Sequence, residues 1–250
     1  MAIEGPSGSG KSSVAAALAR RLDATLLHEA FDRLTGRRSL AFRDRAGLAA
    51  IERRLLAEEA RRWSEAIALR RTGRRVVLDT GTAGPLSYSW GLREGIDVRW
   101  DVVSDLLRRT RQLSAEGRWG LPDLTFYLDV PEAVADARAA RSPLEHPVRL
   151  RERHRVVGRF ERLLYEREFP RRLPGRFGSV VGEGSPGEIA LGLVDRLERL
   201  APVAPVGASE TERFLDLFEG SGPPAGRPRA VERPRAEVAP SASGALDPNS

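Results

Sequence analysis

One short segment constrains the fold of this 250-residue chain more than any other. Residues 5–12 read Gly-Pro-Ser-Gly-Ser-Gly-Lys-Ser, which satisfies the pattern G-x-x-x-x-G-K-S. A short apolar run precedes the segment, and an alanine-rich helical run follows it. A glycine-rich loop between a strand and a helix points its main-chain N–H groups, and the positive end of the helix, at a polyphosphate. The order of these elements therefore predicts a phosphate-binding loop.

The side chains of this loop have separate expected roles. We expect Lys11 to bridge the β- and γ-phosphates of ATP and the Ser12 hydroxyl to ligate Mg²⁺. Lys11 is the only lysine among 41 basic residues, so random placement would put it on the motif's lysine about once in 41. The residues expected to bind the nucleotide are Gly5, Pro6, Ser7, Gly8, Ser9, Gly10, Lys11, Ser12 and Ser13.

Residues 1–200 alternate short apolar runs with helical patterns. The predicted strands are 2–4, 24–28, 75–79, 124–129 and 177–181, and the predicted helices are 11–22, 48–71, 98–113, 131–140, 150–168 and 186–200. Such alternation is typical of a parallel sheet with helices on both faces. We therefore predict an α/β fold, the three-layer P-loop NTPase sandwich with a doubly wound, five-stranded parallel sheet.

A change of composition near residue 201 predicts where this domain ends. Residues 201–250 are rich in Pro, Ala and Gly and hold 8 of the 17 prolines, so we expect a mostly disordered tail. One exception lies at residues 209–219, where Phe214, Leu215, Leu217 and Phe218 form a short apolar cluster. The cluster is a fraying helical turn or a helix that docks on a partner or back on the body.

Composition excludes several classes of protein. The chain has no cysteine and three scattered histidines, which argues against disulfides, thiolate sites and a histidine-rich metal cage. The net charge is +6, but 40 of the 41 basic residues are arginine, so a general compositional bias explains it and nucleic acid is not expected as a partner. No run approaches the about 18 apolar residues of a membrane span, so we expect no membrane partner and a cytoplasmic protein.

Absent residues narrow the choice of nucleotide-binding protein. A GTPase needs an Asn-Lys-x-Asp motif, yet the only asparagine is Asn249 and the only lysine belongs to the phosphate loop. A transporter ATPase needs a Leu-Ser-Gly-Gly signature, which the chain lacks. A P-loop kinase remains.

Two segments carry a family resemblance. Ile-Glu-Gly leads into the phosphate loop, and Pro-Asp-Leu-Thr-Phe-Tyr-Leu-Asp-Val-Pro-Glu at residues 122–132 is followed by Arg138 and Arg141. Over residues 2–200 the chain resembles the thymidylate kinase and deoxynucleoside kinase branch of the nucleoside and nucleotide kinases. The resemblance implies an ATP- and Mg²⁺-dependent kinase domain at 1–200, acting on a nucleoside or nucleoside monophosphate, with a lid at 138–160.

Two carboxylates follow predicted strands. Asp79 would lie at the C-terminal edge of the sheet beside the phosphate loop, where it could hold Mg²⁺ through water or cap a turn. The related kinases usually carry an arginine after this aspartate that contacts the acceptor, whereas this chain has Thr80, with Arg93 among the residues that could replace the arginine. Glu29 stands where the resembling kinases place the general base, with Asp32 as its competitor or a surface role as the alternative.

The expected lid is rich in arginine. Residues 138–176 hold 12 arginines and 5 glutamates. Arginines that close over the transferred phosphoryl group neutralise its developing charge. The resemblance makes Arg138 and Arg141 the first choices, with Arg149 and Arg153 next, and we expect most of the other arginines to lie on a solvated helix face.

The acceptor would contact Glu29, Arg93 and an aromatic platform. Trp90 is the candidate for stacking on the acceptor, with core packing as the equal alternative. Two other functions stay open, a phosphotransferase acting on an antibiotic or another non-nucleotide alcohol, and an ATP-binding regulatory protein that acts through its tail. The oligomeric state stays open between a monomer and a homodimer.

Overall fold

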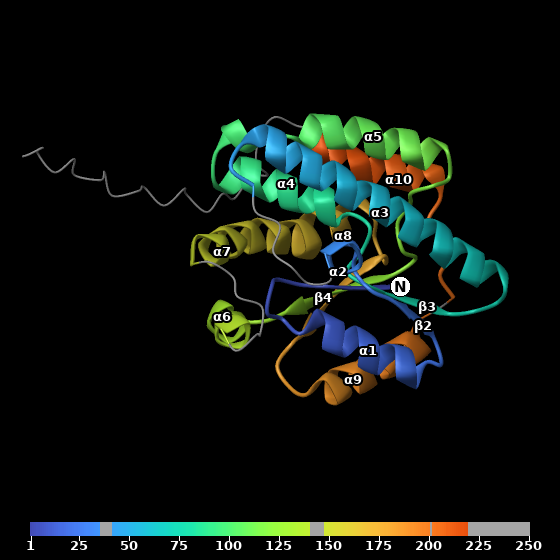
Figure 1. Ribbon diagram of the computed structural model, residues 1–250. Coiled ribbons are helices and arrows are strands. Elements are labelled where there is room, and N and C mark those ends of the chain that lie inside the picture. The colour runs from blue at the N-terminus through green and yellow to red at the C-terminus, as the bar shows by residue number, and fades with distance from the viewer. Residues whose placement is uncertain (36–41, 141–147, 201, 220–250) are drawn as a thin grey trace, which may run out of the picture.

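A parallel β-sheet forms the centre of the protein, with helices on both of its faces (Figure 1). The structure is a computed structural model that describes residues 1–35, 42–140, 148–200 and 202–219. The strands are β1 Ala2–Glu4, β2 Thr25–Leu27, β3 Val76–Asp79, β4 Thr125–Asp129 and β5 Phe177–Val181. Their order is β2-β3-β1-β4-β5, and all neighbouring pairs are parallel, which confirms the predicted five-stranded α/β fold.

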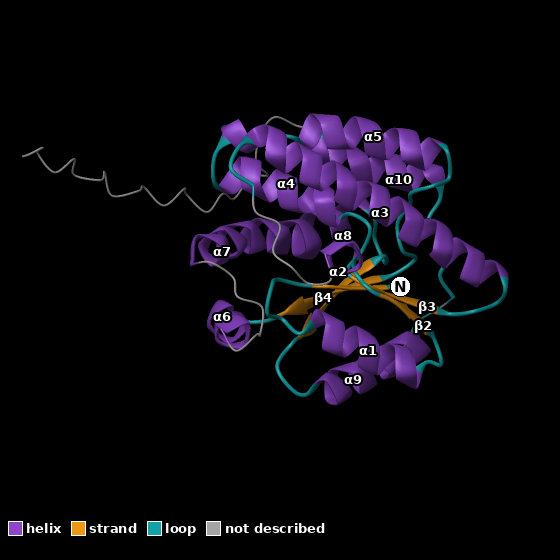
Figure 2. Cartoon of the chain, in the orientation of Figure 1, coloured by secondary structure: helices purple, strands orange, loops and turns teal. Residues whose placement is uncertain are grey.

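Helices cover the sheet in two layers (Figure 2). They are α1 Lys11–Arg21, α2 Ala30–Thr35, α3 Arg45–Arg71, α4 Gly84–Gly95, α5 Val103–Ala115, α6 Glu132–Ala140, α7 Val148–Leu163, α8 Phe169–Arg172, α9 Pro186–Arg199 and α10 Ala208–Leu215. Helices α1 and α9 cover one face, and α3, α4, α5, α7 and α10 lie beyond the other. Within the described residues, no helix combines the length and apolar character that a membrane span needs.

Each face of the sheet has its own apolar core. Ile3 and Phe126 pack with Leu18 between the sheet and helices α1 and α9. On the opposite face Tyr127 belongs to a larger core that includes Phe160. Burial on both faces is typical of a parallel sheet. The predicted site residues stand at the C-terminal edge of this sheet, which its two cores hold in place.

Two helices appear where the sequence predicted none, α2 and α4. Helix α4 contains three glycines, which lower helix propensity, but its packing against α7 needs two of them, Gly91 and Gly95. A Cβ atom at Gly91 would lie 3.0 Å from Val157 Cγ1, and one at Gly95 would lie 2.6 Å from Val156 Cγ1. Close packing of two helices thus overrides the local preference.

The expectation that the folded part ends at residue 200 is wrong for residues 208–218. Helix α10 packs against α5 and α8, and Phe214, Leu215 and Phe218 are buried in the larger core. The rings of Phe169 and Phe214 have centroids 4.5 Å apart. The apolar cluster therefore docks back on the body, the alternative that buries it. The rest of the predicted tail, residues 220–250, lies outside the described residues.

Candidate functional site

The phosphate loop connects the end of β1 to the first turn of α1, as predicted. Gly5, Gly8 and Gly10 have φ angles of 148°, 81° and 93°, which residues with a Cβ atom rarely adopt. The Ser9 N–H donates to the Pro6 carbonyl at 3.0 Å and closes the turn. The loop thus folds over the start of α1, whose first-turn N–H groups have no partner within the helix. This backbone arrangement suits an anion.

Lys11 and helix α6 both make close contacts with the phosphate loop. Lys11 Nζ donates to the Pro6 carbonyl at 3.2 Å, so its ammonium group lies across the loop. A Cβ atom at Gly8 would lie 2.3 Å from the Ala135 carbonyl oxygen of α6. Glycine at this position is therefore required by its φ angle and by the close approach of α6.

The surroundings of Asp79 suit a carboxylate that binds a cation. It ends β3 next to β1, is fully buried, and neither carboxylate oxygen has a hydrogen-bond partner among the described residues. A buried carboxylate without a partner is costly. Mg²⁺ is commonly bound by one or two protein oxygens together with substrate phosphates. Asp79 and the Ser12 hydroxyl fit that donor set, and the described residues contain no cluster of three His, Asp or Glu that could hold a metal alone.

A buried arginine fixes the chain that follows Asp79. Arg62 of α3 is fully buried and pairs with Glu59 at 2.8 Å. Its guanidinium also donates to the carbonyls of His28 at 3.2 Å, Asp79 at 2.7 Å and Thr80 at 2.6 Å. Thr80 has a φ of 68°, which is strained for a β-branched residue. Arg62 thus holds the ends of β2 and β3 in a conformation that the local sequence does not favour.

This conformation positions Glu29. The Thr80 hydroxyl donates to Glu29 Oε2 at 3.1 Å, so the residue that replaces the expected arginine orients the candidate base. Burial raises the pKa of Glu29, although the charge of Lys11 opposes the shift. A raised carboxyl pKa suits a group that must accept a proton near neutral pH. Asp32 lines the same cavity, and the choice between the two carboxylates as base stays a prediction.

A cavity of about 300 Å³ opens beside the phosphate loop. Gly5, Ser7 and Lys11 line it, together with Glu29. The other walls come from α2, α3, α4 and α7. Its volume is that of a small-ligand site, which begins at about 300 Å³. The cavity therefore brings a phosphate-binding group and the candidate base into one space.

The structure places two predicted acceptor contacts away from the cavity, and Trp90 takes the core-packing alternative. Trp90 is 2% exposed and packs edge-to-face on Phe160, with centroids 5.8 Å apart. Arg93 pairs with Glu94 at 2.9 Å. Neither side chain lines the cavity, because both belong to α4, a helix whose turn carries Trp90 toward the core and Tyr88 toward the cavity.

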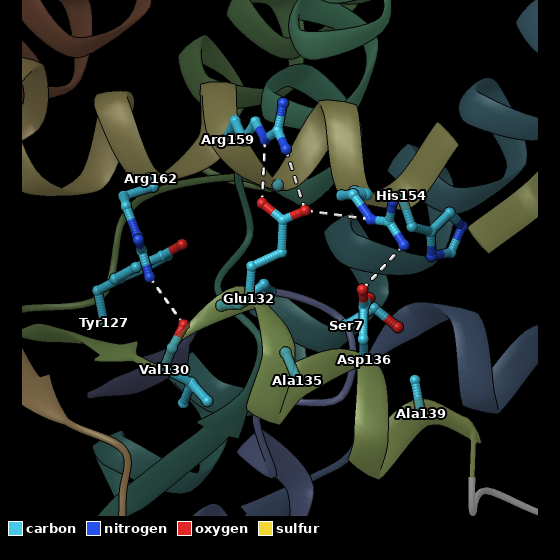
Figure 3. Close-up of a pocket in the computed structure, with 13 residues that line it drawn as sticks. Ser7, Tyr127, Val130, Glu132, Ala135, Asp136, Ala139, His154, Arg159 and Arg162 are labelled. Carbon is cyan, nitrogen blue, oxygen red and sulfur yellow. Dashed lines mark hydrogen bonds and ion pairs between the residues drawn. The ribbon is translucent and has the colours of Figure 1, made fainter. Parts of the chain in front are cut away.

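A smaller pocket of about 140 Å³ lies on the other side of the loop, between α6 and α7. Arg159 donates two bonds of 3.0 Å to Glu132, and Arg155 pairs with Asp136 at 2.9 Å (Figure 3). Arg162 donates to the Val130 carbonyl at 2.8 Å. These three side chains are exposed, as expected for arginines on a solvated helix face, and they also line a pocket next to the phosphate loop.

The predicted lid residues have different outcomes. Arg138 reaches the loop, where it donates to the carbonyls of Ser9 at 3.0 Å and Gly182 at 3.2 Å. Arg153 lies over the ring of Phe42, 4.3 Å from the centroid. Arg141 and the side chain of Arg149 lie outside the described residues. The catalytic role of Arg138 stays a prediction.

Sequence reasoning missed Glu4, although its position offered a signal. It is a carboxylate in a buried strand directly before the loop, and it accepts from the Gly81 N–H at 2.7 Å and from the Tyr165 hydroxyl at 2.7 Å. Burial raises its pKa. Arg62 offered no signal, because α3 carries charged residues around its whole circumference.

Comparisons with known proteins agree with this geometry. No curated protein matches the sequence. Deoxyadenosine kinase from M. mycoides is similar in three solved structures. The structure with bound dATP has a TM-score of 0.58 at 14% identity and covers 79% of this chain and 97% of that chain. The structure with dCMP and a flexible dCDP has a TM-score of 0.59 at 14% identity, covering 80% and 98%. The structure with dCTP has a TM-score of 0.57 at 13% identity, covering 80% and 100%.

These similarities confirm the predicted P-loop fold of the deoxynucleoside kinase type. The family model described as an AAA domain matches residues 1–171, which is more than half of the chain. The chain therefore belongs to the AAA_28 family of AAA domains.

Proposed function

We propose that this protein is an ATP- and Mg²⁺-dependent small-molecule kinase, which transfers the γ-phosphoryl group of ATP to a hydroxyl of a nucleoside-sized acceptor. One observation carries the proposal: a single cavity contains Lys11 of the phosphate loop and the partly buried carboxyl of Glu29. A kinase needs these two groups near each other because one holds the donor and the other receives the proton of the acceptor.

The residues of the loop bind and orient the donor. Its main-chain N–H groups and Lys11 surround the β- and γ-phosphates, and Arg138 adds a positive charge at the same loop. Ser12 and Asp79 would hold Mg²⁺, which supplies charge neutralisation on the phosphate oxygens when bound. Most of the rate enhancement then comes from positioning and electrostatic stabilisation.

Glu29 serves as the base in this proposal. The acceptor oxygen attacks the γ-phosphorus while the bond between that phosphorus and the bridging oxygen of ADP breaks. The hydroxyl proton passes to Glu29, and ADP leaves with the electron pair. The Thr80 hydroxyl keeps the carboxylate oriented during this step. The partial burial of the carboxyl, which raises its pKa, favours this role over that of a surface carboxylate.

A nucleoside is a better acceptor for this cavity than a nucleoside monophosphate, as a thymidylate kinase would use. Thr80 replaces the expected arginine, and Arg93 pairs with Glu94 and does not line the cavity. The runner-up is a non-nucleotide alcohol, which the cavity volume also permits. A regulatory role through the tail has lost its supporting observation, since Phe214 and Phe218 are buried in the body.

A coupled assay of ADP release tests the proposal, with panels of nucleosides, nucleotides and other alcohols as acceptors. We expect turnover with at least one acceptor, and loss of all turnover in Lys11→Met with an unchanged circular dichroism spectrum. Glu29→Gln should lower kcat about 10²- to 10⁴-fold, while Asp32→Asn, on the same wall, retains most activity. If no acceptor raises ADP release above the water background, the kinase assignment is wrong.

A further inference from the structure

The cavity that would hold the acceptor is strongly acidic. Six carboxylate residues line it: Glu4, Glu29, Asp32, Glu52, Glu59 and Glu161. Among the described lining residues, Lys11 and His154 are the only side chains that can carry a positive charge. This balance is unusual in a chain with a net charge of +6. A cluster of carboxylates alone is no site, so the partners of each carboxylate decide what it means.

Asp32 and three other carboxylates of this set have partners inside the protein. Glu4 accepts from Gly81 and Tyr165, Glu29 accepts from Thr80, and Glu59 pairs with Arg62. Hydrogen bonds of this kind compensate the loss of water around a buried carboxylate. They explain Glu4 and Glu59 as parts of the framework of the site.

Glu52 and Glu161 are different. Glu52 of α3 is 2% exposed, and its Oε2 atom is buried without a hydrogen-bond partner among the described residues. Glu161 of α7 is partly buried and lines the same cavity from another helix. Burial raises the pKa of Glu52 to about 8 and that of Glu161 to about 7, although the charge of Lys11 opposes the shift of Glu161. Glu52 thus stands in the cavity without the compensation that buried carboxylates normally have, and Glu161 adds a second carboxylate to the same space.

The walls beside these carboxylates suit an organic cation. Phe31, Phe42 and Tyr88 line the cavity, and aromatic faces attract cations. The ring of Phe42 already carries the guanidinium of Arg153, 4.3 Å from its centroid. A phosphate group would instead add negative charge beside Glu52 and Glu161 and force both carboxyls to stay protonated, whereas a cation would stabilise their ionised forms.

We infer that the acceptor is an alcohol that carries an ammonium group, which Glu52 and Glu161 bind while its hydroxyl faces Glu29. The inference rests on the proposed kinase function, because it names the acceptor of that reaction. An ammonium group donates up to three hydrogen bonds, so it can pair with Glu52 Oε2 and with Glu161 at once. Amino sugars, aminocyclitols and amino nucleosides have the required chemistry.

Matched probes that differ in charge test this inference. One series is 3′-amino-3′-deoxythymidine, thymidine and thymidine monophosphate, and the second is glucosamine, glucose and glucose 6-phosphate. Binding is measured by calorimetry to the full chain, saturated with Mg²⁺ and a non-hydrolysable ATP analogue. We expect the amine to bind about 10-fold or more tightly than its neutral partner in at least one series, because charge-assisted hydrogen bonds are strong.

Isosteric variants test which carboxylates cause the preference for the amine. Glu52→Gln and Glu161→Gln should each lower the ratio of amine to neutral affinity about fivefold or more, since each removes one charge-assisted contact. Glu58→Gln is the matched control, because Glu58 is equally buried on α3 but pairs with Arg33 and Arg61 away from the cavity. It should leave the ratio unchanged.

The outcomes separate the two proposals. The kinase proposal fails if the ATP analogue does not bind or if no acceptor releases ADP. The inference about charge is overturned if no amine binds more tightly than its neutral partner, including the case in which no probe binds. It is also overturned if the preference for the amine survives in both Glu52→Gln and Glu161→Gln, which would place the ammonium group elsewhere.

Discussion

Arg62→Met should destabilise the protein strongly, because Arg62 is fully buried. The variant removes an ion pair of 2.8 Å to Glu59 and donors to the carbonyls of Asp79 and Thr80. Methionine fills similar space but leaves Glu59 buried and unpaired. Breaking a buried pair from one side costs about 3–5 kcal/mol. In a domain of this size each kcal/mol shifts Tm by about 2–4 °C, so we expect Tm to fall by about 6–20 °C.

The neighbouring arginine provides a matched control. The side chain of Arg61 is 68% exposed and pairs with Glu58, so Arg61→Met should cost about 0–1 kcal/mol. The double variant Arg62→Met/Glu59→Met should be more stable than Arg62→Met alone, because it no longer contains a buried charge without a partner. Urea denaturation of the four proteins gives the free energies of unfolding.

The loss of stability in Arg62→Met should also depend on pH. Burial raises the pKa of Glu59 to about 7 even beside Arg62, and without the guanidinium this pKa rises further. Above the unfolded pKa, the folded variant then binds a proton that the unfolded chain releases. Its stability therefore falls as pH rises through this window, and Arg62→Met should be more stable at about pH 5 than at about pH 8. A cost below about 1 kcal/mol at pH 8, or a double variant less stable than the single one, would refute this reasoning.

Three other predictions follow from the same contacts. Gly8→Ala should weaken binding of Mg²⁺-ATP about 10-fold or more in calorimetry, because its Cβ atom meets Ala135; Gly73→Ala, at a similar φ of 79° with open space around it, should not. A chain that ends at residue 207 should melt earlier and scatter light, since the Phe214 core is lost, while one that ends at 219 should not. The pKa of Glu52, about 8, exceeds its unfolded value, so the protein should lose stability as pH rises from about 5 to 8, and Glu52→Gln should flatten that profile of Tm.

The phosphate loop could be predicted from the sequence because its function is local. Consecutive residues supply the N–H groups, the glycines that permit the turn, and Lys11. The parallel sheet could be predicted for a similar reason, since a strand buried on both faces is a short apolar run. Asp79 and Glu29 followed from these predictions, because the ends of neighbouring parallel strands meet at one edge.

The helices that form the walls of the cavity could not be predicted as well. Helix α4 is rich in glycine, and only its close contact with α7 explains why it is helical. Helix α10 follows a proline-rich stretch, and its helix is stabilised by burial of Phe214 against Phe169 rather than by local propensity. Without α4 as a helix, the direction of Trp90 could not be known, so the choice between stacking on an acceptor and core packing stayed open.

The sequence could not show which carboxylates of the cavity lack partners, for another reason. Glu52 and Glu58 stand on the same helix, are both buried, and are written with the same letter. Glu58 pairs with Arg33 and Arg61, whereas Glu52 Oε2 has no hydrogen-bond partner among the described residues. This difference arises from contacts between helices, which periodicity does not record.

The distribution of charge around the phosphate loop links the fold to the choice of substrates. Arg155, Arg159 and Arg162 of α7 line the smaller pocket, but they pair with Glu132, Asp136 and Asp129, so their charges are largely compensated. Glu161 of the same helix lines the larger cavity, where six carboxylates face Lys11 and His154. A triphosphate at the loop needs the positive charge of Lys11, and an acceptor that also carried phosphate would need further positive charge. The described lining of the larger cavity does not provide it, so its electrostatics oppose a second anionic substrate.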